Sequence, residues 1–226
     1  MSAGEPAEAE AEAEAAAGPV EAVVFDLGGV LVRWDPARIY RAMLGSDELV
    51  ADFFDEVGFL QWNHSVDAGE RTWAEAVADL TERYPHRGDL IAAYPARFPE
   101  SLAGPVEGTV EILRELHAAG IRLVGLTNWS AELFPHAREH FDFLQLFEAI
   151  VVSGEERLAK PDPRIFDLVL TRHGLDPSRT VFVDDRQVNV AAARAAGMTG
   201  FRFTDPEHLR RDLTVAGVLP GAGAGP

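Results

Sequence analysis

VVFDLGGVL, residues 23–31, is the stretch on which the interpretation of the whole chain depends. Its first three residues are apolar, as is typical of a strand that is buried on both faces of a parallel sheet. The carboxylate of Asp26 follows at once, and Gly28 and Gly29 then let the backbone turn sharply and approach a ligand. We therefore expect Asp26 at the carboxyl end of a central strand, the edge at which open α/β sheets bind their ligands.

The composition narrows the range of partners. The chain has 226 residues, of which 47% are hydrophobic and 25% are charged, as in a soluble globular protein with one or two domains. Its formal net charge of -17 disfavours nucleic acid and anionic membrane surfaces as partners, because both attract clusters of Lys and Arg. A phosphate ligand would then need a local source of positive charge, such as a metal ion, a single cation or backbone N–H groups.

Three absences from the sequence bear on location and chemistry. There is no Cys, which excludes disulfides and thiolate metal sites. No apolar run approaches the ~18 to 20 residues of a membrane span. The first residues show no basic region followed by an apolar segment, so a signal peptide is not expected. Together these features predict a cytoplasmic protein.

The composition also divides the chain into segments. Residues 1–19 consist largely of Ala and Glu without a hydrophobic face, which predicts a disordered acidic tail, and residues 216–226 are expected to form a flexible C-terminal tail. Across residues 34–99 the apolar spacing is helical and no strand interrupts it. This length exceeds what a βα connection requires, and it predicts an inserted helical cap. Residues 20–33 and 100–215 are expected to form an α/β core.

Strand and helix patterns alternate regularly after residue 100. Strands are expected at 121–126, 149–152, 180–183 and 200–203, and helices at about 106–119, 131–139, 163–173, 188–196 and 206–213. Repeated βα units are typical of a parallel sheet with helices on both faces. The sequence therefore predicts an α/β fold with a doubly wound, Rossmann-like parallel sheet and an inserted helical cap.

The basic residues are distributed unevenly between the two types, since 19 are Arg and Lys160 is the single Lys among the 20. This bias suggests that Arg serves wherever only a surface charge is needed. A position that keeps Lys is then one that requires a compact ammonium on a flexible stem, which Arg does not provide.

Chemically active groups follow, or lie near, the carboxyl ends of the expected strands. They are Asp26, Thr127, Lys160 and the pair Asp184-Asp185. In a parallel sheet these strand ends share one edge, so the side chains can converge in one crevice. A carboxylate, a hydroxyl, a cation and an acidic pair at one place suit phosphoryl transfer through an aspartyl-phosphate.

The charges suggest a role for each carboxylate. Asp26 would be the nucleophile that attacks phosphorus. Because two anions repel, a divalent cation must screen them, and an oxygen-rich site favours Mg²⁺. We expect Asp26, Asp185 and Asp184 as its ligands, with a backbone carbonyl near Gly28 completing the set.

The remaining groups of the expected site would bind the phosphoryl group. The hydroxyl of Thr127 and the N–H of Asn128 can hold its oxygens, and Lys160 would neutralise its charge and steady the nucleophile. Leu27 and Gly28, which directly follow the nucleophile, are further candidates for phosphate binding.

Four stretches of the chain, in order, resemble motifs of the haloacid dehalogenase superfamily of hydrolases. They are VVFDLGGVL, LVGLTNWS, LAKPDPRIF and VFVDDRQVN, and the resemblance extends from about residue 20 to about residue 213. It implies the same roles for Asp26, Thr127, Lys160 and Asp185. The inserted helices resemble the family's cap, which closes over the site and helps to select the substrate.

Gly28 departs from the family's pattern. Most phosphatases of the superfamily that this chain resembles carry a second Asp at this position, as general acid and base, an effect worth ~100 to 10,000-fold in rate. The opening FDLGGVLVRWDPARIY is most similar to the branch that includes bacterial α-D-glucose-1-phosphate phosphatase, which also has Gly there. A sugar 1-phosphate has a more acidic leaving hydroxyl and depends less on an acid. The resemblance therefore implies a small phosphorylated metabolite, such as a sugar phosphate, as substrate.

Two other functions stay open. A metal-independent 2-haloacid dehalogenase would use the same nucleophile and also lacks the second Asp, but dehalogenases share Ser and Asn where this chain has Asp184-Asp185. Adjacent carboxylates near Asp26 would destabilise each other without a cation, which favours the Mg²⁺-dependent phosphatase. The second alternative is a non-catalytic phosphate-binding module that has kept the fold and lost turnover.

His64 and Asp67 are close in sequence to Trp62 in the expected cap. Contact with substrate is one interpretation of these residues, and ordinary cap packing with a turn at residues 67–69 is the one we favour. The sequence predicts neither the identity of the metabolite nor the oligomeric state.

Overall fold

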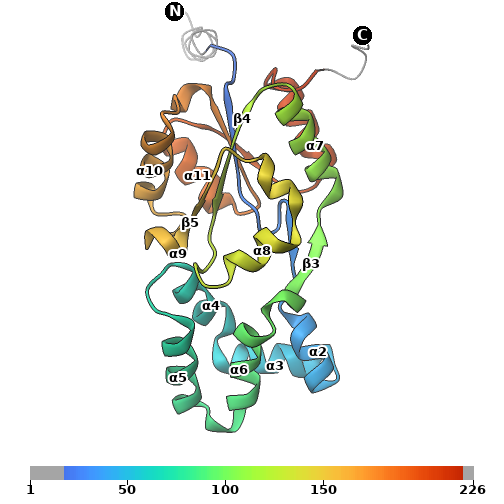
Figure 1. Ribbon diagram of the computed structural model, residues 1–226, viewed down its shortest axis with the longest axis vertical. Coiled ribbons are helices and arrows are strands. Elements are labelled where there is room, and N and C mark those ends of the chain that lie inside the picture. The colour runs from blue at the N-terminus through green and yellow to red at the C-terminus, as the bar shows by residue number, and fades with distance from the viewer. Residues whose placement is uncertain (1–17, 221–226) are drawn as a thin grey trace, which may run out of the picture.

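The computed structural model describes residues 18–220 and shows an α/β core joined to a helical cap (Figure 1). The main sheet has five strands: β1 (Ala22–Phe25), β4 (Arg122–Thr127), β5 (Ala149–Val152), β6 (Thr180–Asp184) and β7 (Thr199–Arg202). All neighbouring pairs are parallel, and the order across the sheet is β5-β4-β1-β6-β7. The predicted doubly wound parallel sheet is confirmed.

Helices cover both faces of this sheet. One face packs against α7 (Glu107–Ala118), α8 (Phe134–His140), the short 3-10 helix η3 (Asp142–Leu146) and α12 (Pro206–Val215). The other packs against α10 (Pro163–His173) and α11 (Gln187–Ala195). The connections also contain the short helices α9 (Ser153–Glu156) and η4 (Pro177–Arg179).

The central position of β1 explains its continuous apolar sequence. Val23 and Phe25 belong to the hydrophobic cluster under α7 and α12, whereas Ala22 and Val24 belong to the cluster under α10. All four side chains have 0% exposure, because a central parallel strand faces helices on both sides.

The cap consists of the helices within residues 37–101, which follow β1. They are α2 (Ala37–Leu44), α3 (Asp47–Val57), α4 (Phe59–Asp67), α5 (Trp73–Arg83), η1 (Pro85–Arg87), α6 (Gly88–Ala96) and η2 (Phe98–Ser101). Capping side chains define two of the starts: Ser46 Oγ accepts the N–H of Leu49, and Thr72 forms a reciprocal capping box with Glu75. Glycines in the left-handed conformation, Gly45 and Gly58, end α2 and α3.

Two short strands that the sequence did not predict link the cap to the core. β2 (Val32–Trp34) pairs antiparallel with β3 (Leu102–Pro105), so the chain leaves and re-enters the core through a two-stranded ribbon. β2 has only three residues and β3 ends in Gly104-Pro105, which favour turns rather than strands. The pairing therefore depends on the cap bringing the two segments together.

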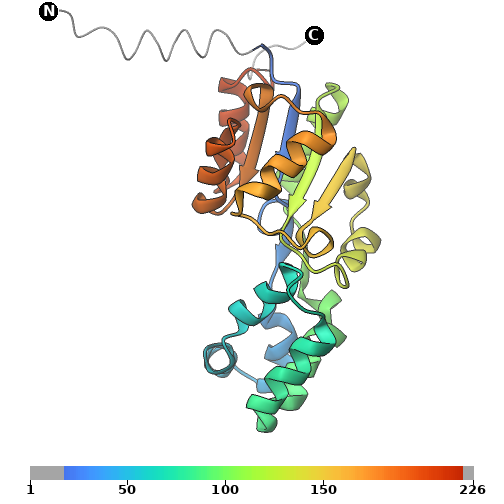
Figure 2. The ribbon, with the colours of Figure 1, turned by 90° about the vertical axis from the view of Figure 1, so that its left-hand side faces the viewer.

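The cap lies at the carboxyl edge of the sheet, and its interior is continuous with that of the core (Figure 2). Aromatic rings pack against one another both within the cap and across its junction with the core. Within the cap, the Trp62 and Trp73 rings lie 5.0 Å apart, and across the junction the Phe98 and Trp129 rings lie 5.8 Å apart.

The described residues include only part of each expected tail. Most of the expected acidic tail, and residues 221–226 of the expected C-terminal tail, lie outside the described residues. Val218 and Leu219 fall within the segment expected to be flexible, yet they are buried in the core with 7% and 4% exposure. Within residues 18–220, no helix is long and apolar enough to cross a membrane.

Candidate active site

Parallel pairing brings the predicted site residues to one edge of the sheet. Phe25 is level with Gly125 on β4 and with Val183 on β6. Asp26 therefore follows β1 at the level where β4 is about to end in Thr127 and β6 ends in Asp184. Asp26 also donates its backbone N–H to Val183 O at 2.8 Å, which extends the pairing up to the carboxylate.

Lys160 lies at the centre of this edge with 1% of its surface exposed. Its Nζ is 2.9 Å from Asp26 Oδ1 and 2.7 Å from Asp184 Oδ2, and it donates to Leu126 O at 2.7 Å. These acceptors use all three ammonium protons. Burial alone would lower the pKa of Lys160, but the two carboxylates outweigh burial and raise it.

The two carboxylate oxygens of Asp26 have different surroundings. Oδ1 accepts the N–H of Leu27 at 2.7 Å and pairs with Lys160, whereas no hydrogen bond to Oδ2 is found among the described residues. Burial raises the pKa of Asp26 to about 7, Lys160 opposes this shift, and Asp184 and Asp185 add to it. Oδ2 is thus the oxygen available for chemistry.

Three carboxylates share this edge with one ammonium. Ligand atoms of Asp26, Asp184 and Asp185 all lie within 4.8 Å of one another. Burial, and then the neighbouring Asp184, raise the pKa of the partly exposed Asp185. A set of hard oxygen donors with excess negative charge fits a divalent cation such as Mg²⁺.

Asp184 is already occupied by protein donors. Its Oδ1 accepts from Arg186 N–H at 2.8 Å and Asn189 Nδ2 at 2.9 Å. Its Oδ2 accepts from Lys160 Nζ at 2.7 Å and again from Asn189 Nδ2 at 3.0 Å. Asp184 is therefore arranged to hold Lys160, and Asp26 and Asp185 keep the more available oxygens for a cation.

Two asparagines support the site through their side chains. Asn189, on the first turn of α11, was not singled out from the sequence, although it ends the stretch VFVDDRQVN. Asn128 was expected to act through its N–H, and its side chain proves to bond Lys160 twice: Nδ2 donates to Lys160 O at 2.9 Å and Oδ1 accepts Lys160 N–H at 2.9 Å. Thr127, which precedes it, has 1% exposure.

The three residues of the turn after Asp26 differ in how closely other atoms surround them. The Leu27 side chain has 0% exposure, so only its backbone belongs to the site. Gly29 has φ +80°, and an added Cβ would lie 2.9 Å from Asp185 Oδ2, so glycine is required there. An added Cβ on Gly28 would meet nothing within 4 Å, so this position has room for a side chain.

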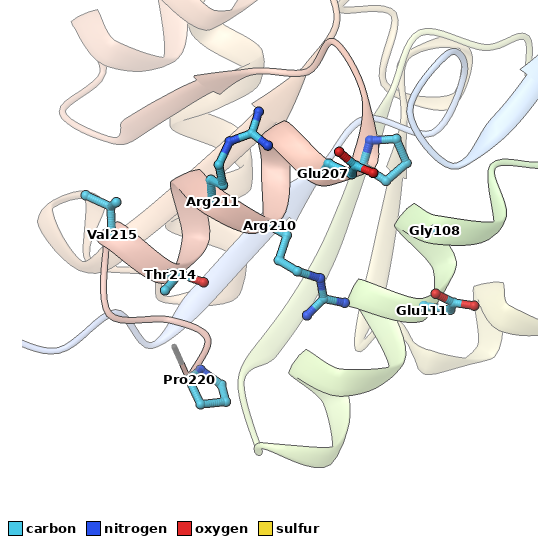
Figure 3. Close-up of a pocket in the computed structure, with 9 residues that line it drawn as sticks. Gly108, Glu111, Glu207, Arg210, Arg211, Thr214, Val215 and Pro220 are labelled. Atoms are coloured by element: carbon cyan, nitrogen blue, oxygen red, sulfur yellow. The ribbon is translucent and has the colours of Figure 1, made fainter. Parts of the chain in front are cut away.

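A separate hollow of about 610 Å³ lies on the outer surface of the core between α7 and α12 (Figure 3). Its lining includes Gly108, Glu111 and Arg211. None of the predicted site residues lines it, and Arg210 at its wall is paired with Glu115 at 2.6 Å. We therefore assign the chemistry to the sheet edge and not to this hollow.

Comparison with known proteins agrees with this geometry. Residues 20–197 match the family model of haloacid dehalogenase-like hydrolases. The chain is 30% identical over 186 residues to the sesquiterpene phosphatase astK of Aspergillus oryzae, covering 82% of this chain and 90% of that protein. It is 31% identical over 207 residues to a phosphoglycolate phosphatase of Caulobacter vibrioides, covering 87% of each.

Solved structures show the same fold. The structure of the enzyme BT-2542 from Bacteroides thetaiotaomicron, in complex with magnesium and inorganic phosphate, matches with a TM-score of 0.64 and 24% identity. The match covers 82% of this chain and 95% of that one.

Proposed function

The chain belongs to the haloacid dehalogenase-like hydrolases, and on this premise we propose that it is a Mg²⁺-dependent phosphatase of a small phosphorylated metabolite. The observation that carries the proposal is the constellation of Asp26, Lys160, Asp184 and Asp185 at one sheet edge. The phosphatase relatives at 30% and 31% identity support phosphate chemistry.

Asp26 is the proposed nucleophile. Its Oδ1 is fixed by Leu27 N–H and Lys160, which leaves the remaining oxygen, Oδ2, to attack the phosphorus of a bound substrate. Attack forms a bond from Oδ2 to phosphorus and breaks the bond from phosphorus to the leaving oxygen, which takes a proton from water, so that an aspartyl-phosphate remains on the enzyme. A second water then attacks the phosphorus of this acyl phosphate, which releases inorganic phosphate and regenerates the carboxylate of Asp26.

The neighbouring groups bind the phosphoryl oxygens and set the charge. In the proposal, Thr127 Oγ1 and Asn128 N–H donate to phosphoryl oxygens, and Lys160 offsets part of their negative charge. A divalent cation held by Asp26, Asp185 and a backbone carbonyl near Gly28 would supply the charge screening that two approaching anions need.

The proposal is tested by phosphate release from a panel of phosphorylated metabolites, with Mg²⁺ and with EDTA. We expect turnover that EDTA abolishes and that Asp26→Asn lowers by at least ~1,000-fold, since the amide is a poor nucleophile. Asp52→Asn is the matched control, because Asp52 is exposed on α3 and should leave turnover unchanged. An Asp26→Asn enzyme with full turnover would contradict the nucleophile assignment.

The same assay separates the alternatives. Halide release from 2-chloropropionate that EDTA does not affect would favour the dehalogenase. Stoichiometric phosphate binding without hydrolysis of any substrate would favour the binding module. The excess of carboxylates around Lys160 favours the phosphatase over the metal-independent dehalogenase, because a cation stabilises such a cluster. Only the turnover assay separates the phosphatase from the binding module.

A further inference from the structure

The cap contacts the core at a second place besides the β2–β3 ribbon. There, the end of α4 and the start of α5 lie against α9 and the loop that follows β4 (Figure 1). We call this junction the clasp and define it by the cap residues Asp67, Gly69 and Trp73 and the core residues Ser130, Ser153 and Gly154.

Asp67 makes two kinds of contact across the clasp. Its backbone carbonyl accepts the hydroxyl of Ser153, whose Oγ in turn accepts the N–H of Trp129 at 2.9 Å. Its carboxyl group accepts Nδ2 of Asn63 on its own helix at 2.6 Å and lies beside the backbone N–H of Ser130 in the core loop. One cap residue thus contacts the core through both its backbone, at Ser153, and its side chain, beside Ser130.

Further contacts show that the clasp is a specific interface. The indole Nε1 of Trp73 donates to Ser130 Oγ at 2.9 Å, and its backbone N–H donates to Glu132 Oε1 at 2.8 Å. A Cβ on Gly69 would lie 2.9 Å from Gly154 O, so glycine at this position lets the cap backbone approach α9 closely. Within the core, a Cβ on Gly154 would lie 2.5 Å from Ala131 N, so α9 in turn packs closely against the loop that follows β4.

The core side of the clasp continues directly into the active site. Ser130 is two residues from Asn128, whose side chain holds the backbone of Lys160 at both its N–H and its carbonyl. The ammonium of Lys160 in turn holds Asp26 and Asp184. A displacement of the loop 128–131 would therefore be transmitted to the group that orients the nucleophile.

We propose that Asp67 is a positioning residue: its carboxyl group holds the loop 128–131 and so couples the cap to the placement of Lys160 against Asp26. This coupling rests on the proposed phosphatase function for its kinetic consequence. Its structural consequence, the ordering of the loop, does not depend on any activity.

The surroundings of Asp67 indicate which form of the carboxyl group acts. Burial raises its pKa to about 8, although the bonds from Ser130 and Asn63 oppose the shift. Tyr94 of α6 also faces it, since burial and then the charge of Asp67 raise the pKa of Tyr94. The hollow beside the clasp is bordered by the ionisable residues Glu70, Arg71, Glu75, Glu132 and Arg157. At neutral pH the group therefore acts chiefly as a neutral hydrogen-bonding partner, a role that an amide can fill.

The test compares Asp67→Ala, Asp67→Asn and Ser153→Ala with the wild type, and uses Asp52→Ala on α3 as a matched control. Hydrogen exchange of the backbone amides 129–131 and 154 reports on the loop, and kcat and KM with p-nitrophenyl phosphate and Mg²⁺ report on the site. We expect Asp67→Ala to accelerate exchange and to lower kcat/KM about tenfold, the equivalent of one hydrogen bond left unmade. Asp67→Asn should restore both, and Ser153→Ala should accelerate exchange.

Each result has a definite meaning. Unchanged exchange in Asp67→Ala, or in Ser153→Ala if Asp67→Ala does not fold, would overturn the proposal. An Asp67→Asn enzyme as slow as Asp67→Ala would also overturn it, because the carboxyl group would then act through its proton or charge. If the wild type shows no phosphatase activity, the proposed function fails, and the exchange data still decide whether Asp67 orders the loop.

Discussion

Gly28 bears on the choice of substrate, because most related phosphatases would have a proton-donating Asp at this position. In the mechanism proposed above, no carboxylic acid at this position protonates the leaving group. An added Cβ there would meet nothing within 4 Å, so sterics do not exclude a larger residue. Under the proposed function, the missing acid would favour substrates whose leaving hydroxyl needs little help from a proton donor.

Introducing a carboxyl group at position 28 should change the preference between alkyl phosphates and sugar 1-phosphates. We expect Gly28→Asp to raise kcat/KM for alkyl phosphates by up to ~100-fold, the lower range of general acid catalysis, and to raise sugar 1-phosphate hydrolysis much less. Parallel assays of both substrate classes measure this ratio. Gly28→Ala is the control, since it adds the Cβ without the acid and should leave the ratio unchanged. Equal gains on both classes would show that proton donation does not limit the wild type.

The site residues differ in how far the sequence could reveal them. Lys160 could be predicted because it is the single Lys in the chain and lies near a strand end. The side-chain roles of Asn128 and Asn189 could not, because each depends on a partner 32 or 5 residues away in the folded chain. For Asp67 the sequence favours a turn residue, because Ser130 and Ser153, which lie far away in sequence, become its neighbours only in the folded chain.

At the scale of helices and strands, local signals decided what could be predicted. The bounds of α10, 163–173, agree with the prediction because its ends are marked by Pro163, the Asp162 cap and Gly174 in the left-handed conformation. β2 and β3 have no comparable signals, and each is stabilised by pairing with the other across about 70 residues of chain. Their formation is a consequence of the cap and not of their own sequence.

The close approach of α4 to α9 predicts a difference between two glycines of the cap. Gly69 and Gly58 both have positive φ, +70° and +64°, so Ala at either position is strained by about 1 to 2 kcal/mol. Only Gly69 faces the core, where a Cβ would lie 2.9 Å from Gly154 O. Thermal unfolding should therefore show Gly69→Ala to be less stable than Gly58→Ala by about a further 1 to 3 kcal/mol.

Activity provides the second readout of this pair of variants. Because Gly69→Ala pushes the clasp apart, we expect it to lower kcat/KM, whereas Gly58→Ala should retain the wild-type value after correction for stability. Equal stability and equal activity of the two variants would show that cap and core do not touch at Gly69.

For the whole molecule, buried carboxyl groups make stability depend on pH. Burial raises the pKa of Asp26 to about 7 and that of Asp67 to about 8, above the ordinary value of 3.8. Between its ordinary pKa of 3.8 and its raised folded-state pKa, each carboxyl group therefore takes up a proton when the chain folds. The stabilisation that this proton uptake gives is fully present below about pH 4 and is lost as the pH rises through the folded-state pKa. This sign is opposite to that of exposed ion-paired carboxylates such as Asp162, whose pKa the neighbouring Arg164 lowers to about 2.

The contribution of Asp67 to the pH dependence of stability can be isolated, because an amide in place of its carboxyl group does not titrate. Between about pH 5 and pH 8, the free energy of unfolding of the wild type should fall relative to that of Asp67→Asn. The relative slope is at most about 1.4 kcal/mol per pH unit, the limit for one proton. Urea unfolding at several pH values measures this difference, and the titrations of Asp26 and Asp162 cancel because both proteins share them. Asp52→Asn, on exposed α3, should run parallel to the wild type across the same range. A constant difference between wild type and Asp67→Asn would mean that Asp67 keeps its ordinary pKa, and hence that the closed cap does not bury its carboxyl group.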